Sequence, residues 1–185
     1  MNALQVANES PIPTMIYNFP TVTAGIDLDS DTIGELAVHP NIVGTKLSCG
    51  NIGKLHRLTA RTRFSNKFAV YPGRSDTYLF GLLGGGAGVI AALVNLFPRL
   101  HVKLYRLFQE GEITEAMELQ EKFSQADWAV SQIGGIGGLK ALITTFFGYG
   151  NTAVRGPLKP VDLINLSGTE SYEIIARLTE MENVP

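Results

Sequence analysis

Short apolar runs alternate with longer amphipathic segments through the first half of the chain. The apolar runs have the length and composition of buried strands, and they cover Ile12–Tyr17, Ile42–Lys46, Phe68–Tyr71 and Gly88–Ala92. Strand starts near residues 12, 42, 67 and 88 repeat at about 20–30 residues, a spacing typical of parallel strands joined by crossover helices. The pattern therefore predicts an α/β fold with four parallel strands.

Helices are predicted in the connections between these strands, because residues that favour N-caps precede amphipathic runs. The predicted caps are Asp29-Ser30-Asp31, Asn51 and Ser75-Asp76, and the helices that follow them run to about Val38, through Leu58 and to about Leu83.

The second half of the chain is predicted to be helical, because its apolar residues recur at helical spacing. The expected helices cover about Phe97–Gln109, Ile113–Val130, Gly138–Phe147 and Glu170–Met181. Glycine and proline residues mark a loop before the last of them.

Composition excludes several classes of protein. Of the 185 residues, 45% are hydrophobic and 17% are charged, which indicates a folded domain, and the net charge of −2 favours neither nucleic acid nor a membrane surface as a partner. Cys49 is the single cysteine, so a disulfide within the chain is excluded. No signal peptide or membrane span is recognised, and we expect a cytoplasmic protein or one of the mitochondrial matrix.

Two polar residues end predicted strands, where parallel α/β folds place reactive groups. A lysine in low-dielectric surroundings, as expected for Lys46, favours the neutral amine that attacks ketones, although a lysine that reaches into solvent fits the position equally. Tyr17 fits either a proton shuttle or a core ring whose hydroxyl is paired with the backbone. The glycine-rich segments Gly84–Gly88 and Gly134–Gly138 fit no phosphate-binding motif and are interpreted as turns.

Five motifs follow one another along nearly the whole chain. They are Tyr17–Pro20 followed by Thr23–Gly25, His39–Lys46 followed by Ser48 and Gly50, Tyr71–Gly73 with Ser75-Asp76, Gly84–Asn95, and Phe146–Leu158. Together they resemble the dihydrodipicolinate synthase / N-acetylneuraminate lyase family of (β/α)8 pyruvate aldolases. The resemblance implies a Schiff-base lyase in which Lys46 forms the imine and Tyr17 moves the proton.

The same resemblance assigns further roles and a fold. It places Ser48, Gly73 and Asp76 at the hydroxylated part of the substrate, and a backbone carbonyl of Ile90 near the site. It also implies a partial TIM barrel, about strands 5–8, with four βα units in residues 1–95 and a C-terminal helical extension of the same domain in 96–185. No metal or organic cofactor is expected, because the imine serves as the electron sink.

The chain departs from the family pattern at Val22, where dihydrodipicolinate synthases carry an arginine that binds a substrate carboxylate. Dihydrodipicolinate synthase is therefore the alternative, whereas Asn41–Lys46 and Phe147–Tyr149 are more similar to the 4-hydroxy-2-oxoglutarate and 2-keto-3-deoxy-sugar-acid aldolases.

A second departure is length, since a complete barrel needs roughly 250 residues. We expect Met1–Glu9 to be the tail of the fourth barrel helix, so the chain is truncated and lacks the family's paired threonines that bind the pyruvate carboxylate. The expected partners are a 2-oxo acid substrate of the pyruvate type and either further copies in a homo-oligomer or a missing N-terminal half. Two alternatives remain: a non-catalytic chain that pairs with full-length subunits, and a four-strand binding domain unrelated to aldolases.

Overall fold

A computed structural model of the protein describes residues 3–62 and 68–184. The chain divides into two compact units, Met1–Ala91 and Ala92–Pro185, each with its own buried hydrophobic residues.

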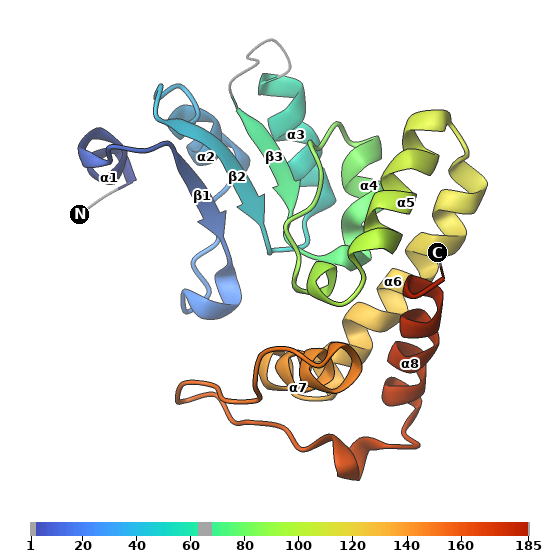
Figure 1. Ribbon diagram of the computed structural model, residues 1–185. Helices are drawn as coiled ribbons and strands as arrows, with labels where there is room; N and C mark the ends of the chain where they lie inside the picture. Colours follow the sequence, from blue (N-terminus) through green and yellow to red (C-terminus); the bar gives the residue numbers. More distant parts are fainter. Residues whose placement is uncertain (1–2, 63–67, 185) are drawn as a thin grey trace. The chain divides into compact units, whose positions relative to one another are not determined.

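The first unit is an α/β structure built on a three-stranded parallel sheet in the order β1-β2-β3 (Figure 1). Its elements are α1 (Ala3–Glu9), β1 (Thr14–Asn18), η1 (Pro20–Val22), α2 (Ser30–Leu36), β2 (Ile42–Leu47), α3 (Ile52–Thr62), β3 (Ala69–Pro72), η2 (Ser75–Thr77) and α4 (Tyr78–Leu83). Three of the predicted strands and the parallel crossover arrangement are therefore confirmed. The predicted helix at Met1–Glu9 is confirmed from Ala3 onward, while residues 1–2 and the expected strand start at 67 lie outside the described residues.

Strand register places three side chains in one row across the sheet. Tyr17 of β1 is the partner of Lys46 of β2, and Lys46 is the partner of Tyr71 of β3. Partners in neighbouring strands project from the same face of a sheet, and consecutive residues project from opposite faces. The row therefore defines one face, whereas Thr45 and Leu47 project from the other.

The face that carries Leu47 is covered by helices and forms the core of the first unit. Its fully buried members include Ile33 of α2 and Leu55 and Leu58 of α3, which pack with Leu47 and Val70 of the sheet. Burying one such side chain stabilises the fold by about 1.5–3 kcal/mol. The opposite face, which carries Lys46, is not covered by any of the described helices of this unit and retains half-exposed side chains such as Met15.

Two of the predicted helix caps are confirmed. The Asp29 carboxylate accepts a hydrogen bond from the N–H of Thr32 at 2.7 Å, and the Asn51 side-chain oxygen accepts one from the N–H of Lys54 at 2.8 Å. Each bond satisfies an N–H group that the first turn of a helix leaves without a partner inside the helix.

The helix predicted after Ser75-Asp76 begins later than expected. Ser75 and Asp76 lie inside the short 3₁₀ turn η2, and α4 begins only after it, at Tyr78. The Asp76 carboxylate contacts the Arg74 guanidinium.

The fourth predicted strand, Gly88–Ala92, was also wrong. The segment lies beside β3 and donates two hydrogen bonds to it, from Ala87 N–H to the Val70 carbonyl (2.9 Å) and from Ile90 N–H to the Pro72 carbonyl (3.1 Å). The donors are three residues apart and the acceptors two, so the chain bulges at Gly88, whose φ is +155°. Pro72 has no N–H to donate back, so one hydrogen bond of a regular ladder is missing here. Among the described residues the sheet therefore has three strands.

The second unit is helical. After the turn η3 (Ala92–Asn95) come α5 (Pro98–Glu110), α6 (Ile113–Gln132), α7 (Ile136–Phe147), the turn η4 (Leu163–Leu166) and α8 (Glu170–Glu182), which confirms the four helices predicted for this half. The long helix α6 contacts α5, α7 and α8, and its buried Phe123 and Ala126 lie at the centre of the unit. Within the parts of the chain that the structure describes, no helix combines the length and the apolar composition that a membrane crossing requires.

Candidate active site

Lys46 lies near the carboxyl end of the central strand, on the face that the helices of the first unit leave open. It is half-buried between Thr45 and Leu47, which are 0% and 2% exposed on the covered face. The Thr45 hydroxyl donates to the Ile16 carbonyl at 3.2 Å, which fixes β2 to β1 directly beside the lysine. The burial of its neighbours thus forces Lys46 toward the open face.

Tyr17 occupies the matching position on β1. The Nζ atom of Lys46 lies 4.3 Å from the centre of the Tyr17 ring, a cation–π contact. The ring is also 5.4 Å from that of Phe19, and the side chain is 51% exposed. Tyr17 is therefore not a core ring, which was the other interpretation that its sequence position allowed.

Ser48 and Gly73 complete a continuous group with this pair. The Ser48 hydroxyl donates a 3.4 Å hydrogen bond to the Tyr17 hydroxyl oxygen. A Cβ at Gly73 would lie 2.2 Å from the Ser48 Oγ, so glycine is required for the ends of β2 and β3 to approach this closely. The structure thus brings Tyr17, Lys46, Ser48 and Gly73 together.

The other two residues predicted for the site are attached to it through the end of β3. Asp76 follows Gly73 by three residues, and its Oδ2 accepts bonds from the Arg74 Nε and Nη2, both at 2.8 Å. Ile90 donates its N–H to the carbonyl of Pro72, the residue before Gly73.

Tyr71 belongs to the same row and was missed from the sequence. It is half-buried, it is the β3 partner of Lys46, and its ring lies 3.5 Å from where a Cβ of Gly88 would stand. The signal that could have identified it is its place two residues before Gly73 in a strand, because such alternate positions share a face.

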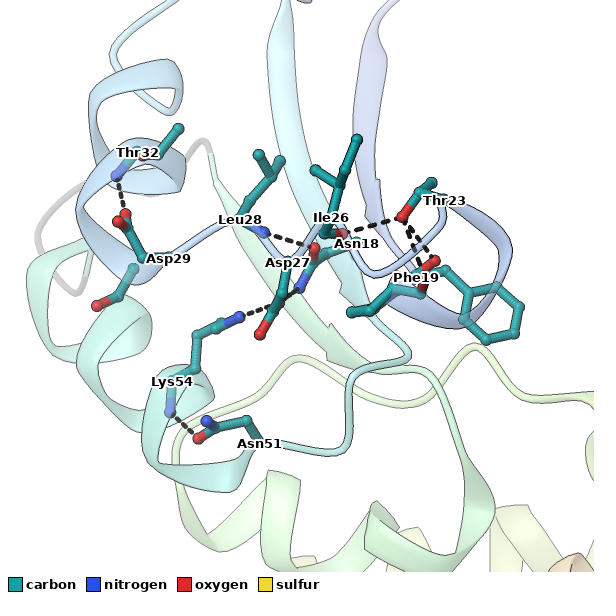
Figure 2. A network of polar contacts seen from close by, with 12 residues as sticks. Asn18, Phe19, Thr23, Ile26, Asp27, Leu28, Asp29, Thr32, Asn51 and Lys54 are labelled. Carbon is teal, nitrogen blue, oxygen red and sulfur yellow. Dashed lines mark hydrogen bonds and ion pairs between the residues drawn. The ribbon is translucent and has the colours of Figure 1, made fainter.

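A polar network on the covered side of the site was also missed (Figure 2). Lys54 of α3 is 3% exposed and its ammonium contacts the Asp27 carboxylate, which also accepts a 2.7 Å hydrogen bond from the Asn18 side chain. These hydrogen bonds, that from Lys54 first, lower the pKa of Asp27 below its usual value. No periodicity marks Lys54 as buried, because a lysine on an amphipathic helix usually faces solvent.

The described residues around this group include no cluster of metal ligands, and the position expected for a carboxylate-binding arginine is apolar. Within residues 3–62 and 68–184, no three His, Cys, Asp or Glu side chains gather as metal ligands would. Val22 of η1, the position at which the family resemblance would place an arginine, is a 65% exposed apolar side chain.

The fold and this site define a class: an α/β protein with a lysine–tyrosine pair at the carboxyl ends of adjacent parallel strands. A sequence model of the Dihydrodipicolinate synthetase family matches residues 3–183, and the chain belongs to that family.

Relatives with curated names are similar over most of the chain. The protein of Emericella nidulans named "Probable 4-hydroxy-2-oxoglutarate aldolase, mitochondrial" is 44% identical over 155 residues, which are 84% of this chain and 49% of that protein. The L-threo-3-deoxy-hexylosonate aldolase of Hypocrea jecorina is 40% identical over 171 residues, 89% of this chain and 54% of that protein. The chain thus spans about half the length of the curated relatives it matches.

A solved structure gives the same picture. A prophage protein of the dihydrodipicolinic acid synthase family from Escherichia coli K12, crystallised in complex with pyruvate, superposes with a TM-score of 0.78 and 26% identity. The match covers 96% of this chain and 57% of that chain. The sequence resemblance to this family is confirmed.

Proposed function

We propose that this chain carries the imine-forming part of a class I, pyruvate-dependent aldolase, a carbon–carbon lyase. The single observation that carries the proposal is the 4.3 Å contact between Lys46 and Tyr17 at the ends of parallel strands. Family membership supports it, and so do the names of two relatives, which are aldolases of 2-oxo acids.

In this proposal Lys46 is the nucleophile. Its neutral amine attacks the C2 carbonyl of the 2-oxo acid, and the carbinolamine loses its oxygen as water to give a protonated imine. The C3–C4 bond then breaks, its electron pair passes into the imine to form an enamine, and the C4 hydroxyl becomes the aldehyde as it loses its proton. Protonation of C3 and hydrolysis release pyruvate and restore the amine. Every electron shift is internal, so the sequence of steps uses no cofactor.

Tyr17 serves two purposes in these steps. Its ring face, beside the Lys46 nitrogen, stabilises the positive charge of the protonated imine by about 0.5–1 kcal/mol, the usual size of an exposed cation–π contact. Its hydroxyl, held by Ser48, moves protons to the departing oxygen and from the C4 hydroxyl. The Ser48–Tyr17 bond supports this role because it fixes the position of the phenol oxygen.

The substrate class that we propose is a 4-hydroxy-2-oxo acid. Ser48, Gly73 and Asp76 would contact its hydroxylated part, with the Ile90 carbonyl nearby. Dihydrodipicolinate synthase activity is less favoured, because the exposed apolar Val22 offers no bidentate partner for a second carboxylate.

We further propose that residues 1–95 form part of a (β/α)8 barrel with 96–185 as its helical extension, completed by an N-terminal half or by further copies of the chain. The supporting observation is the open face of the sheet, where Met15 and Tyr17 of the edge strand β1 are 43% and 51% exposed. The same face favours the second candidate function, a non-catalytic subunit that pairs with full-length aldolases. The cytoplasm or the mitochondrial matrix is the proposed location, as the name of the Emericella relative suggests.

Borohydride trapping tests the proposal. The purified chain is incubated with pyruvate and sodium borohydride, and adducts are mapped by mass spectrometry. We expect one adduct at Lys46, lost in Lys46→Ala and retained in Lys103→Ala, whose lysine is exposed on α5. A folded chain that forms no adduct at Lys46, alone or with a full-length relative, would refute the catalytic proposal. Co-elution with that relative, without any adduct, would favour the non-catalytic subunit.

A further inference from the structure

An ion pair between a buried lysine and an aspartate that is 44% exposed lies on the covered side of the sheet, next to the candidate active site but outside the residues assigned to it. Lys54 is 3% exposed, and its ammonium contacts the Asp27 carboxylate. Taking an ammonium out of water costs roughly several kcal/mol unless the ammonium is paired and hydrogen-bonded. A lysine kept at this position therefore calls for a reason beyond helix formation.

The pair is bonded to the residue that follows Tyr17. Asn18, the last residue of β1, is 2% exposed, and its side-chain amide donates to Asp27 at 2.7 Å. Its side-chain oxygen accepts the N–H of Leu28 at 3.1 Å, so both ends of the amide are held (Figure 2). Asn18 thereby joins the end of β1 to Lys54 through the segment that contains Asp27.

The backbone of Asn18 also reaches the active-site group. Its carbonyl accepts the N–H of Ser48 at 2.9 Å, and the Ser48 hydroxyl contacts the Tyr17 hydroxyl. Consecutive residues of a strand project from opposite faces. Because Asn18 is held on the covered face, the direction in which Tyr17 projects from the open face is also fixed.

We propose that Lys54, acting through Asp27 and Asn18, is a positioning residue that holds the Tyr17 phenol against Lys46 and Ser48. The inference deepens the proposed function and rests on it for the meaning of the Tyr17–Lys46 contact. The network is a set of direct contacts from α3 to the end of β1, and Lys54 itself is too buried to form an imine with a substrate.

A double-mutant cycle tests whether Lys54 acts through Tyr17. The rate of the pyruvate–borohydride adduct at Lys46 is measured in the full chain for Lys54→Met, Tyr17→Phe and the double variant. Displacement of the phenol by about 1 Å slows such a step on the order of tenfold to a hundredfold in Lys54→Met. The double variant is expected to react no more slowly than Tyr17→Phe, because the hydroxyl that Lys54 positions is already gone. Multiplicative losses, or no loss in Lys54→Met, would overturn the inference.

Arg61→Met is the matched control. Arg61 lies on the same helix and makes an ion pair with Asp31 of α2 at 2.7 Å, but this pair is exposed and does not touch β1. We expect its adduct rate to equal that of the native chain. If Lys54→Met does not fold, Lys54→Met combined with Asp27→Asn removes both charges and takes its place, since the Asp27 side chain is 44% exposed and a neutral amide can stay solvated there.

A second measurement does not depend on pyruvate. Acetylation of Lys46 by acetic anhydride at one pH is compared with that of Lys103 by mass spectrometry. Loss of the ring contact frees the amine, and we expect acetylation to be about 2–5 times faster in Tyr17→Leu and equally so in Lys54→Met. An unchanged rate in either variant overturns the inference. If the native chain forms no imine but both variants are acetylated faster than the native chain, the proposed function is refuted and the positioning role of Lys54 stands.

Discussion

The Nζ atom of Lys46 lies 4.3 Å from the centre of the Tyr17 ring, and the two residues are register partners on adjacent parallel strands. Strand pairing places the two residues side by side: Thr45 and Leu47 are buried on the covered face, so the residue between them projects toward the open one. An amine and a phenol are thereby held together in a chain of the dihydrodipicolinate synthetase family.

Tyr17→Phe separates the two roles proposed for the tyrosine. The variant keeps the ring beside Lys46 and loses the hydroxyl that Ser48 contacts. We expect the pyruvate adduct at Lys46 to form at least about 10²-fold more slowly than in the native chain, because proton transfer by a positioned side chain contributes about 10²–10⁴-fold to the rate. Tyr105→Phe, on α5, is the control and should react at the native rate. Equal rates for both variants would remove the hydroxyl from the mechanism.

Gly73→Ala should damage both fold and site. The new Cβ would stand 2.2 Å from the Ser48 Oγ and 2.8 Å from its backbone nitrogen, so Ser48 must move away from Tyr17. Overpacking of this kind costs about 1–3 kcal/mol, and we expect a lower thermal midpoint together with slower adduct formation. Gly53→Ala on α3 is the matched control, since its Cβ would meet atoms only at 3.4 Å. That change should raise the midpoint, because alanine favours a helix over glycine by about 1 kcal/mol.

His101 should make the second unit sensitive to mild acid. It is 4% exposed, stacks on Phe123 at 4.1 Å, and donates from Nδ1 to the Phe97 carbonyl. Burial lowers the pKa of His101 from 6.5 to about 4. Between these two pH values the unfolded chain binds a proton at His101 that the folded chain does not bind. The contribution of His101 to stability is therefore fully present above pH 6.5 and is lost as the pH decreases toward 4.

The size of this effect follows from the pKa difference. Between pH 7.5 and pH 5 we expect the native chain to lose about 2 kcal/mol of unfolding free energy through this histidine. Urea unfolding followed by the fluorescence of Trp128, the single tryptophan, measures it in the second unit. His101→Gln should lose correspondingly less over the same interval, whereas His56→Gln, at an exposed position, should behave like the native chain. A pH dependence that His101→Gln leaves intact would contradict the prediction.

Glu182 should stabilise the second unit as a distant helix cap. Its carboxylate, 4% exposed on α8, accepts the N–H groups of Arg99 and Leu100 in the first turn of α5 at 2.8 and 2.9 Å. Glu182→Ala leaves both groups without this acceptor, and we expect a loss of about 1–3 kcal/mol in the same urea experiment. Glu180→Ala, exposed on the same helix, is the control. Equal midpoints for the two variants would show that the bonds contribute nothing.

Local pattern determined the elements of this protein. Three strands, the caps Asp29 and Asn51, and the four helices of the second half follow from side-chain spacing and short-range hydrogen bonds, which act within one or two turns of chain. The positions of Lys46 and Tyr17 at strand ends follow in the same way, because a strand is recognised by its own residues.

Tertiary structure decided what those elements do together. Gly88–Ala92 has the apolar character of a strand, but Pro72 on the neighbouring strand has no N–H to complete the ladder. Tyr71 joins the row of Lys46 only because β3 pairs with β2 in one register, and the partner of the buried Lys54 is Asp27, which lies 27 residues away in the sequence. Register and burial depend on which segments distant in sequence lie side by side, and a local pattern does not show which segments pair.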